Sequence, residues 1–174
     1  MTLKAHYARA MEWLYIACIA VSGIALVLIT LAIPYGVFMR YALNAAVSWP
    51  EPFAVILMVL FSFVGGAAVF RANAHIAIRA LSDAVPPAVR RVMRRLVELA
   101  MISASLFMIV YGVALVRTTW HQGLAEFPGF PVGLNYAPIP LGGLLTLLFI
   151  IEKLWAGEPS ENSVMYADAP IAAE

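Results

Sequence analysis

Long apolar runs alternate with short polar segments along the chain. Four runs contain no charged side chain, at about residues 13–39, 53–70, 99–116 and 134–151. A helix needs about 20 mainly apolar residues to cross the roughly 30 Å hydrocarbon core of a bilayer. The first run is too long for the ~7–15-residue core of a cleaved signal peptide, so it is expected to remain in the mature protein. The pattern predicts four transmembrane helices.

A different pattern precedes the third run. Apolar residues recur there at helical spacing, at Val89, Val92, Met93, Leu96 and Val97. The opposite face carries Arg90, Arg91, Arg94 and Arg95. The spacing predicts a short amphipathic helix over about residues 86–97 that lies on the membrane surface, with its arginines facing anionic lipid. The alternative is an extension of the third membrane helix into the cytoplasm, with Glu98 paired to Arg94 or Arg95.

Composition agrees with a membrane protein. The chain has 174 residues, of which 63% are hydrophobic and 12% charged, with mean hydropathy +0.89. Soluble domains carry about twice that charged fraction. The predicted fold class is an all-α membrane protein with four transmembrane helices plus a short amphipathic interfacial helix between the second and third. Residues 1–156 are expected to form the membrane domain, and the acidic segment 157–174 a disordered cytoplasmic tail.

The basic residues predict the orientation. Nine of the eleven Lys and Arg residues lie in the N-terminal segment, the 71–95 connection and the C-terminal flank, whereas only Arg40 and Arg117 lie on the other side. Short cytoplasmic loops carry the excess of basic residues. Both termini are therefore expected in the cytoplasm.

Residues suited to catalysis or to metal binding are sparse. His6, His75 and His121 lie near the predicted membrane boundaries and not at ligand spacing, and Cys18 is the single cysteine. The sequence has no CxxC pair, phosphate-binding glycine loop, HExxH or GxSxG motif. It predicts no enzyme, no cofactor, no metal site and no nucleic-acid partner.

Charged residues occur at the ends of the predicted spans, where long side chains reach the interface at low cost. We therefore expect no buried charge and no ion pathway through this chain, which favours an accessory subunit. One alternative is a self-associating four-helix small exporter, for which Glu12 and Glu98 are the candidate membrane carboxylates. Another is the membrane anchor of a respiratory complex, which would normally place haem-ligating histidines inside its spans.

Two further sets of residues are candidates for contacts. Small residues at Ser62, Gly65, Gly66, Ala100 and Ala104 would let a neighbouring helix approach closely. Polar clusters lie at the boundaries: Arg40, Asn44, Trp49 and Glu51 on the outer side, and Arg71, Asn73 and His75 on the inner side. Taken alone, each cluster is better explained by simple anchoring of the helix ends at the interface than by a functional site.

The order of these clusters resembles the DctQ-like family, the small membrane subunit of tripartite ATP-independent periplasmic (TRAP) transporters. The resemblance covers about residues 10–155. It rests on Phe38-Met39-Arg40-Tyr41, Trp49-Pro50-Glu51, Gly65-Gly66, Phe70-Arg71, His75-Ile76, Tyr136, Pro138, Pro140 and Gly142. Two positions depart from the family pattern, because Pro52 and Arg79 stand where the family often has acidic residues.

The resemblance implies a subunit of the bacterial inner membrane that works with partners. A periplasmic binding protein would capture a small organic anion, commonly a carboxylate, and a large membrane subunit would import it with sodium. This chain would be part of the fixed scaffold. Arg40, Trp49 and Glu51 would orient its outer face, and Arg71 and His75 would fix the inner end of the second helix.

Overall fold

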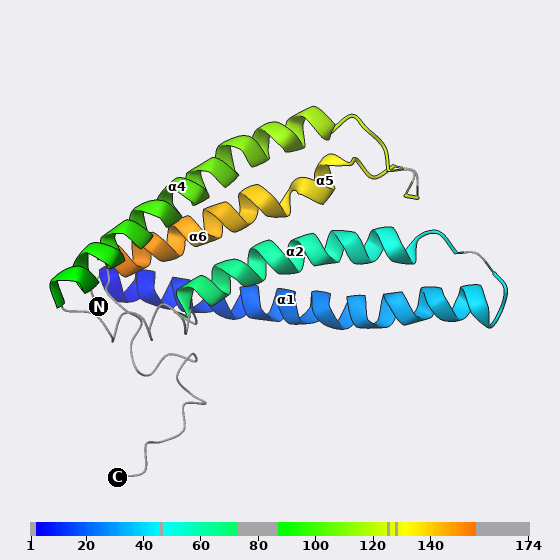
Figure 1. The fold of residues 1–174 in the computed structure, drawn as a ribbon, viewed down its shortest axis with the longest axis horizontal. Coiled ribbons are helices and arrows are strands. Elements are labelled where there is room, and N and C mark those ends of the chain that lie inside the picture. The colour runs from blue at the N-terminus through cyan, green and yellow to red at the C-terminus, as the bar shows by residue number, and fades with distance from the viewer. Residues whose placement is uncertain (1–2, 46, 73–86, 125, 128, 156–174) are drawn as a thin grey trace, which may run out of the picture.

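A computed structural model describes residues 3–45, 47–72, 87–124, 126–127 and 129–155. Its helices are α1 (Leu3–Tyr41), α2 (Pro50–Arg71), α4 (Pro87–Thr119), α5 (Gly133–Tyr136) and α6 (Pro138–Trp155), shown in Figure 1. Within the described part, four helical segments are long and apolar enough to cross a membrane, and no strand is present beyond an isolated bridge between Gly123 and Pro131. The predicted all-α fold with four spans is confirmed.

The helices extend beyond the apolar runs that predicted them. At 1.5 Å per residue, the 39 residues of α1 give a length of about 58 Å, and the 33 residues of α4 about 50 Å. Proline is suited to the first turn of a helix, and Pro50 begins α2. Asn44, just after α1, has a φ of 51°, a left-handed conformation that asparagine tolerates better than most residues. Both α1 and α4 are therefore longer than the hydrocarbon core is thick.

The helices are arranged in a row. Helix α1 packs on α2, α2 packs on α6, and α6 packs on α4, with only a small contact between α1 and α6. Figure 1 shows α4 and α6 running obliquely to the α1–α2 pair. Because α1 and α4 stand at the two edges of this row, each has a broad face that no other described helix covers.

The contact between α1 and α2 follows a heptad pattern. Buried residues recur along α1 at alternating steps of four and three, at Met11, Tyr15, Cys18, Ser22 and Ala25, and Ala32 continues the series. On α2 the buried positions include Ala54, Val64, Ala68 and Arg71. A 3.5-residue repeat is the pattern of left-handed, nearly antiparallel helix packing. Most of these side chains are small, so the two backbones lie close together.

Helix α6 fits between its neighbours because of two adjacent glycines. A Cβ on Gly142 would lie 2.8 Å from the Cβ and carbonyl oxygen of Phe63 on α2. A Cβ on Gly143 would lie 2.9 Å from the carbonyl oxygen of Ser105 and the Cβ of Met108 on α4. The backbone of α6 therefore touches α2 on one side and α4 on the other. No side chain fits at either position without a shift of the neighbouring helix.

The predicted amphipathic segment is helical, but it is not separate. Residues 87–97 form the beginning of α4, which continues without a break to Thr119. A continuous helix is what the alternative interpretation expects, in which this segment extends the third span. That the segment lies on the membrane surface stays a prediction. The predicted tail, residues 157–174, lies outside the described residues.

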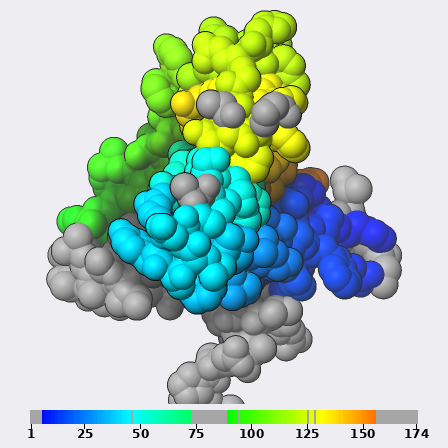
Figure 2. Space-filling view, turned by 90° about the vertical axis from the view of Figure 1, so that its right-hand side faces the viewer, coloured from blue at the N-terminus to red at the C-terminus, as the bar shows by residue number. Residues whose placement is uncertain are grey.

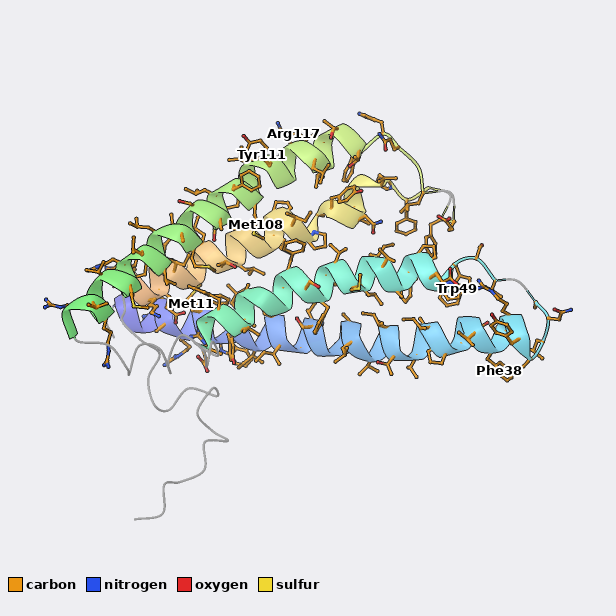
Figure 3. The ribbon with its side chains drawn as sticks, in the orientation of Figure 1. Met11, Phe38, Trp49, Met108, Tyr111 and Arg117 are labelled. Carbon is orange, nitrogen blue, oxygen red and sulfur yellow. The ribbon has the colours of Figure 1, made fainter. Side chains whose placement is uncertain are left out.

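The surface of the membrane region is apolar. Large side chains such as Ile24, Leu31, Phe107 and Val110 are exposed in the chain taken alone. Figure 3 shows Tyr111 and Arg117 on the side of α4 turned away from α6. We name the two ends of the bundle by the predicted orientation. The inner end holds the N-terminus and Trp155. The outer end, viewed in Figure 2, holds the described parts of the α1–α2 connection and of the segment between α4 and α5.

Candidate functional site

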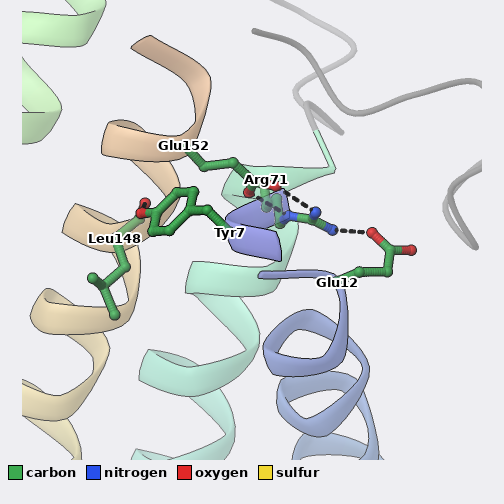
Figure 4. Close-up of polar contacts among 5 residues, drawn as sticks. All are labelled: Tyr7, Glu12, Arg71, Leu148 and Glu152. Atoms are coloured by element: carbon green, nitrogen blue, oxygen red, sulfur yellow. Dashed lines mark hydrogen bonds and ion pairs between the residues drawn. The ribbon is translucent and has the colours of Figure 1, made fainter. Parts of the chain in front are cut away.

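A buried ion-pair cluster lies at the inner end of the bundle, where three helices meet (Figure 4). Arg71 ends α2, and its guanidinium donates two hydrogen bonds to Glu152 of α6. The distances are 2.7 Å from Nε to Oε2 and 2.8 Å from Nη2 to Oε1. A third hydrogen bond joins Nη1 to Oε2 of Glu12 on α1, at 2.9 Å. One cation therefore binds carboxylates from both neighbouring helices. We call these three residues the inner cluster.

Aromatic rings surround the inner cluster. The guanidinium carbon of Arg71 lies 5.0 Å from the ring centre of Tyr15 and 5.6 Å from that of Phe149, within the range of cation–π contacts. The hydroxyl of Tyr7 donates a hydrogen bond of 3.3 Å to the carbonyl oxygen of Leu148, which ties α1 to α6 again. These contacts connect α1, α2 and α6 at one point.

Burial makes the inner cluster a structural element of the fold. The side chains of Arg71 and Glu152 are only 3% and 4% exposed, and that of Glu12 is 22% exposed. A buried charge is tolerated when it is paired and hydrogen-bonded, whereas removing one partner leaves the other uncompensated. The bidentate arrangement also fixes the angle between the two side chains. The cluster therefore specifies how the inner ends of three helices pack.

This finding corrects the expectation that the chain has no buried charge. Because they lie at the ends of the predicted spans, Arg71, Glu12 and Glu152 are expected from the sequence to reach the interface. The expectation was wrong because Arg71 turns into the packed end of the bundle. The signal in the sequence was a cation and two carboxylates at the inner ends of three spans. It could not be used without knowing which helices are neighbours.

The outer candidates lie together at the corner between α1 and α2. Arg40 Nη2 donates a hydrogen bond of 2.9 Å to Glu51 Oε1. The ring of Trp49 lies between those of Tyr35 and Phe53, at centroid distances of 5.7 and 5.9 Å. The ion pair is well exposed, with side-chain exposures of 52% and 73%. A pair so exposed contributes little to stability, so these groups remain accessible for contacts.

Of the candidate packing residues, one packs within this chain and the others lie on its surface. Gly65 faces α1, where a Cβ would lie 3.2 Å from the hydroxyl oxygen of Ser22. Ser62, Gly66, Ala100 and Ala104 are exposed in the chain taken alone. Gly65 is thus used within this chain, and the other positions form open surface.

The candidate basic residues lie on the beginning of α4. Arg90, Arg91 and Arg95 are exposed, and Arg95 Nη1 donates a hydrogen bond of 3.2 Å to Glu98 Oε2. The side chain of Arg94 and the whole of His75 lie outside the described residues. Among the residues that the structure does describe, no group of three His, Cys, Asp or Glu side chains is placed to hold a metal ion.

These features are those of a multi-pass helical membrane protein in which a buried ion-pair cluster joins three helices at one end of the bundle. The family model of the DctQ component of tripartite ATP-independent periplasmic transporters matches residues 29–158. The chain therefore belongs to the DctQ family, and it is a transporter membrane subunit, not an enzyme.

Two relatives agree with this assignment. A TRAP transporter small permease protein of Haemophilus influenzae is 24% identical over 155 residues, which cover 88% of this chain and 91% of the relative. The ectoine TRAP transporter small permease protein TeaB of Halomonas elongata is 29% identical over 108 residues, covering 62% and 56% of the two chains.

Proposed function

We propose that this chain is the accessory scaffold subunit of a sodium-coupled TRAP transporter that imports a small organic anion. Its partners would be a large membrane subunit and a periplasmic binding protein. One observation carries the proposal: the central part of every span lacks a charged residue, and the buried charges of the inner cluster are paired at a helix end. Ion-coupled pathways usually need polar or charged groups within the membrane, so the pathway belongs to a partner.

The surface offered to the large subunit includes an exposed stripe on α2. The stripe runs along one side of the helix and comprises Val55, Met58, Ser62, Gly66 and Val69. Apart from the adjoining backbone of α2, no atom of the described residues lies within 4 Å of the position that a Cβ on Gly66 would take. A glycine inside a helix costs about 0.5–1 kcal/mol relative to alanine, and no described contact within this chain offsets that cost. Close packing of a partner helix against Gly66 would offset this cost and explain why glycine stands at this position.

Ser22 belongs to the contact within the chain and not to the stripe. Its Oγ is buried beside Gly65, between α1 and α2. The stripe itself is the side of α2 turned away from this contact. Ala100 and Ala104 provide a second flat surface on α4.

The outer corner suits contact with the binding protein. Arg40, Glu51 and Trp49 combine exposed charge with an aromatic surface, and they lie at the outer end of the bundle. The transported solute is expected to be a carboxylate. The relative from Halomonas elongata is named for ectoine, which supports a small organic solute as the cargo class.

Co-purification tests the proposal. Detergent extracts should yield this chain together with a much larger multi-helix protein, and uptake into cells should fail when this chain is deleted. Recovery of a stable lone monomer that itself catalyses uptake in liposomes would overturn it.

A matched pair of variants tests the proposed surface. Gly66→Ile should preserve the fold of this chain, because the position is open, but should lose the large subunit. Gly23→Ile, at an equally open position on α1, should retain it. Loss of the partner from the Gly23 variant alone would show that the α2 stripe is not the interface.

A further inference from the structure

The beginning of α4, residues 87–97, reaches beyond the helix on which α4 packs. In the contact between α4 and α6, Gly143 meets Ser105, and Gly112 meets Pro140. Continuing this antiparallel register brings Trp155, the last residue of α6, level with residues 93–97 of α4. Residues 87–92 therefore lie beyond the end of α6. We call residues 87–97, from the start of α4 to the level of Trp155, the basic end of α4.

The two faces of the basic end continue the two faces of the span. Positions seven residues apart lie on nearly the same side of a helix. One such series faces α6 and runs through Arg91, Glu98, Ser105 and Gly112, of which Ser105 and Gly112 are buried. The other series is exposed throughout and runs through Val89, Leu96, Ser103 and Val110.

This continuity makes the apolar side of the basic end a prolongation of the surface that meets the membrane. Val89, Val92 and Leu96 are 46%, 60% and 61% exposed. A helix extending straight into water would leave all three hydrated, at a cost of up to about 1.5–3 kcal/mol for each side chain that could otherwise be buried. The length of α4, about 50 Å, is sufficient to cross the core at a tilt and to continue in the headgroup layer.

The arginines lie where headgroups would be. They occupy the α6-facing side of the basic end but begin where α6 stops, so they face across the inner end of the bundle. Arg9 of α1 and Lys153 of α6 lie at the same end. Of the acidic side chains described there, Glu12 and Glu152 bind Arg71, and Glu98 accepts a hydrogen bond from Arg95 Nη1. Among the described residues, basic side chains therefore outnumber acidic ones at the inner end, with apolar side chains immediately beside them.

We propose that the basic end of α4 is a binding site for anionic phospholipid headgroups of the inner leaflet. Arg90, Arg91 and Arg95 bind the phosphate groups, with the planar guanidinium forks that suit phosphate oxygens. Val89, Val92 and Leu96 insert among the upper parts of the acyl chains. The charge complementarity of arginine and phosphate, joined to an apolar stripe continuous with the span, favours lipid over a soluble acidic protein. This proposal does not depend on which transporter partners the chain has.

Lipid retention tests the headgroup contacts. The full chain, with any subunits that it retains, is placed in nanodiscs of phosphatidylcholine with or without phosphatidylglycerol, and co-purifying lipids are counted by native mass spectrometry. Wild type should retain phosphatidylglycerol selectively. The triple variant R90Q/R91Q/R95Q should lose this preference, by about fivefold in affinity for each arginine. The control R40Q/R117Q, changed at the outer end, should retain it. Equal retention by wild type and the triple variant would overturn the proposal.

Depth measurement tests the apolar stripe while Arg90 and Arg95 stay in place. In a Cys18→Ala background, spin labels are attached at Val92→Cys and, separately, at Arg91→Cys. Label 92 should be relaxed more by oxygen, which dissolves in the bilayer, and label 91 more by a water-soluble nickel chelate. If both labels were equally accessible to the chelate, the basic end would project into water and the proposal would fail.

Discussion

Arg71 and Glu152 lie 81 residues apart in the sequence and join α2 to α6 through two parallel hydrogen bonds of 2.7 and 2.8 Å. Glu12 binds the remaining side of the same guanidinium. Both partners of the main pair are almost fully buried, so each carboxylate depends on the arginine and the arginine depends on both.

Removing the arginine should therefore be costly. Arg71→Met leaves two carboxylates without their cation, and the expected loss of stability is about 3–5 kcal/mol. The change is measured as the melting temperature in detergent, monitored by size-exclusion chromatography of samples heated to increasing temperatures. The control is Arg40→Gln at the exposed outer pair, for which less than about 1 kcal/mol is expected. Equal losses at the two positions would show that burial does not set the strength of these pairs.

The two carboxylates should not be equivalent. Glu152→Gln replaces a carboxylate that accepts two hydrogen bonds from Arg71 and is 4% exposed, whereas Glu12 accepts a hydrogen bond of 2.9 Å from Arg71 and is 22% exposed. We expect Glu152→Gln to destabilise the chain more than Glu12→Gln, because hydration compensates the more exposed site. Melting temperatures of the two single variants and the double variant measure the difference. A larger effect at Glu12 would place the principal contact of Arg71 on α1.

Two glycines should respond to alanine with opposite signs. At Gly142 a Cβ would lie 2.8 Å from the backbone of Phe63, so Gly142→Ala should push α6 away from α2 and cost about 1–3 kcal/mol. At Gly66 the space is open, and Gly66→Ala should stabilise the isolated chain by up to about 1 kcal/mol through helix propensity. Thermal stability of the purified chain measures both. Destabilisation at Gly66 in the absence of any partner would contradict this account of the α2 surface.

The orientation can be tested by reporter fusion. A reporter active only in the periplasm should give signal when fused at Ala125 and none when fused at Ala88, because the basic residues gather on the side of Ala88. A reporter active only in the cytoplasm should give the complementary result. The reverse pattern would invert the names of the inner and outer ends.

Much of the fold was available from the sequence because the bilayer imposes a simple length rule. Each of the four apolar runs lies in a helical segment of membrane length, the fourth shared between α5 and α6, and residues 87–97 of the predicted amphipathic segment are helical as well. Helix ends were predicted less well, since polar flanks continue a helix once it has formed. The sequence also places Arg40 and Glu51 near each other, because only a short connection separates α1 from α2.

Contacts between distant segments were not available in that way. The positions of Arg71 and Glu152 at helix ends predict interfacial residues, and Gly142 is marked in the sequence only by the family resemblance. Neither the ion pair nor the packing role of Gly142 is visible until the order of the helices is known, and four apolar helices can be arranged in several orders.

The sequence by itself therefore determined how many times the chain crosses the membrane and what kind of residues end each crossing, because burial of backbone and apolar groups in lipid depends on local composition. Which helix lies beside which became clear only from the packed structure. The helix order in turn sets which charges are buried and which glycines lie against a neighbouring helix. The physical reason is that lipid solvates all apolar faces alike, so the order of the helices depends on close packing and on pairing of polar groups across interfaces.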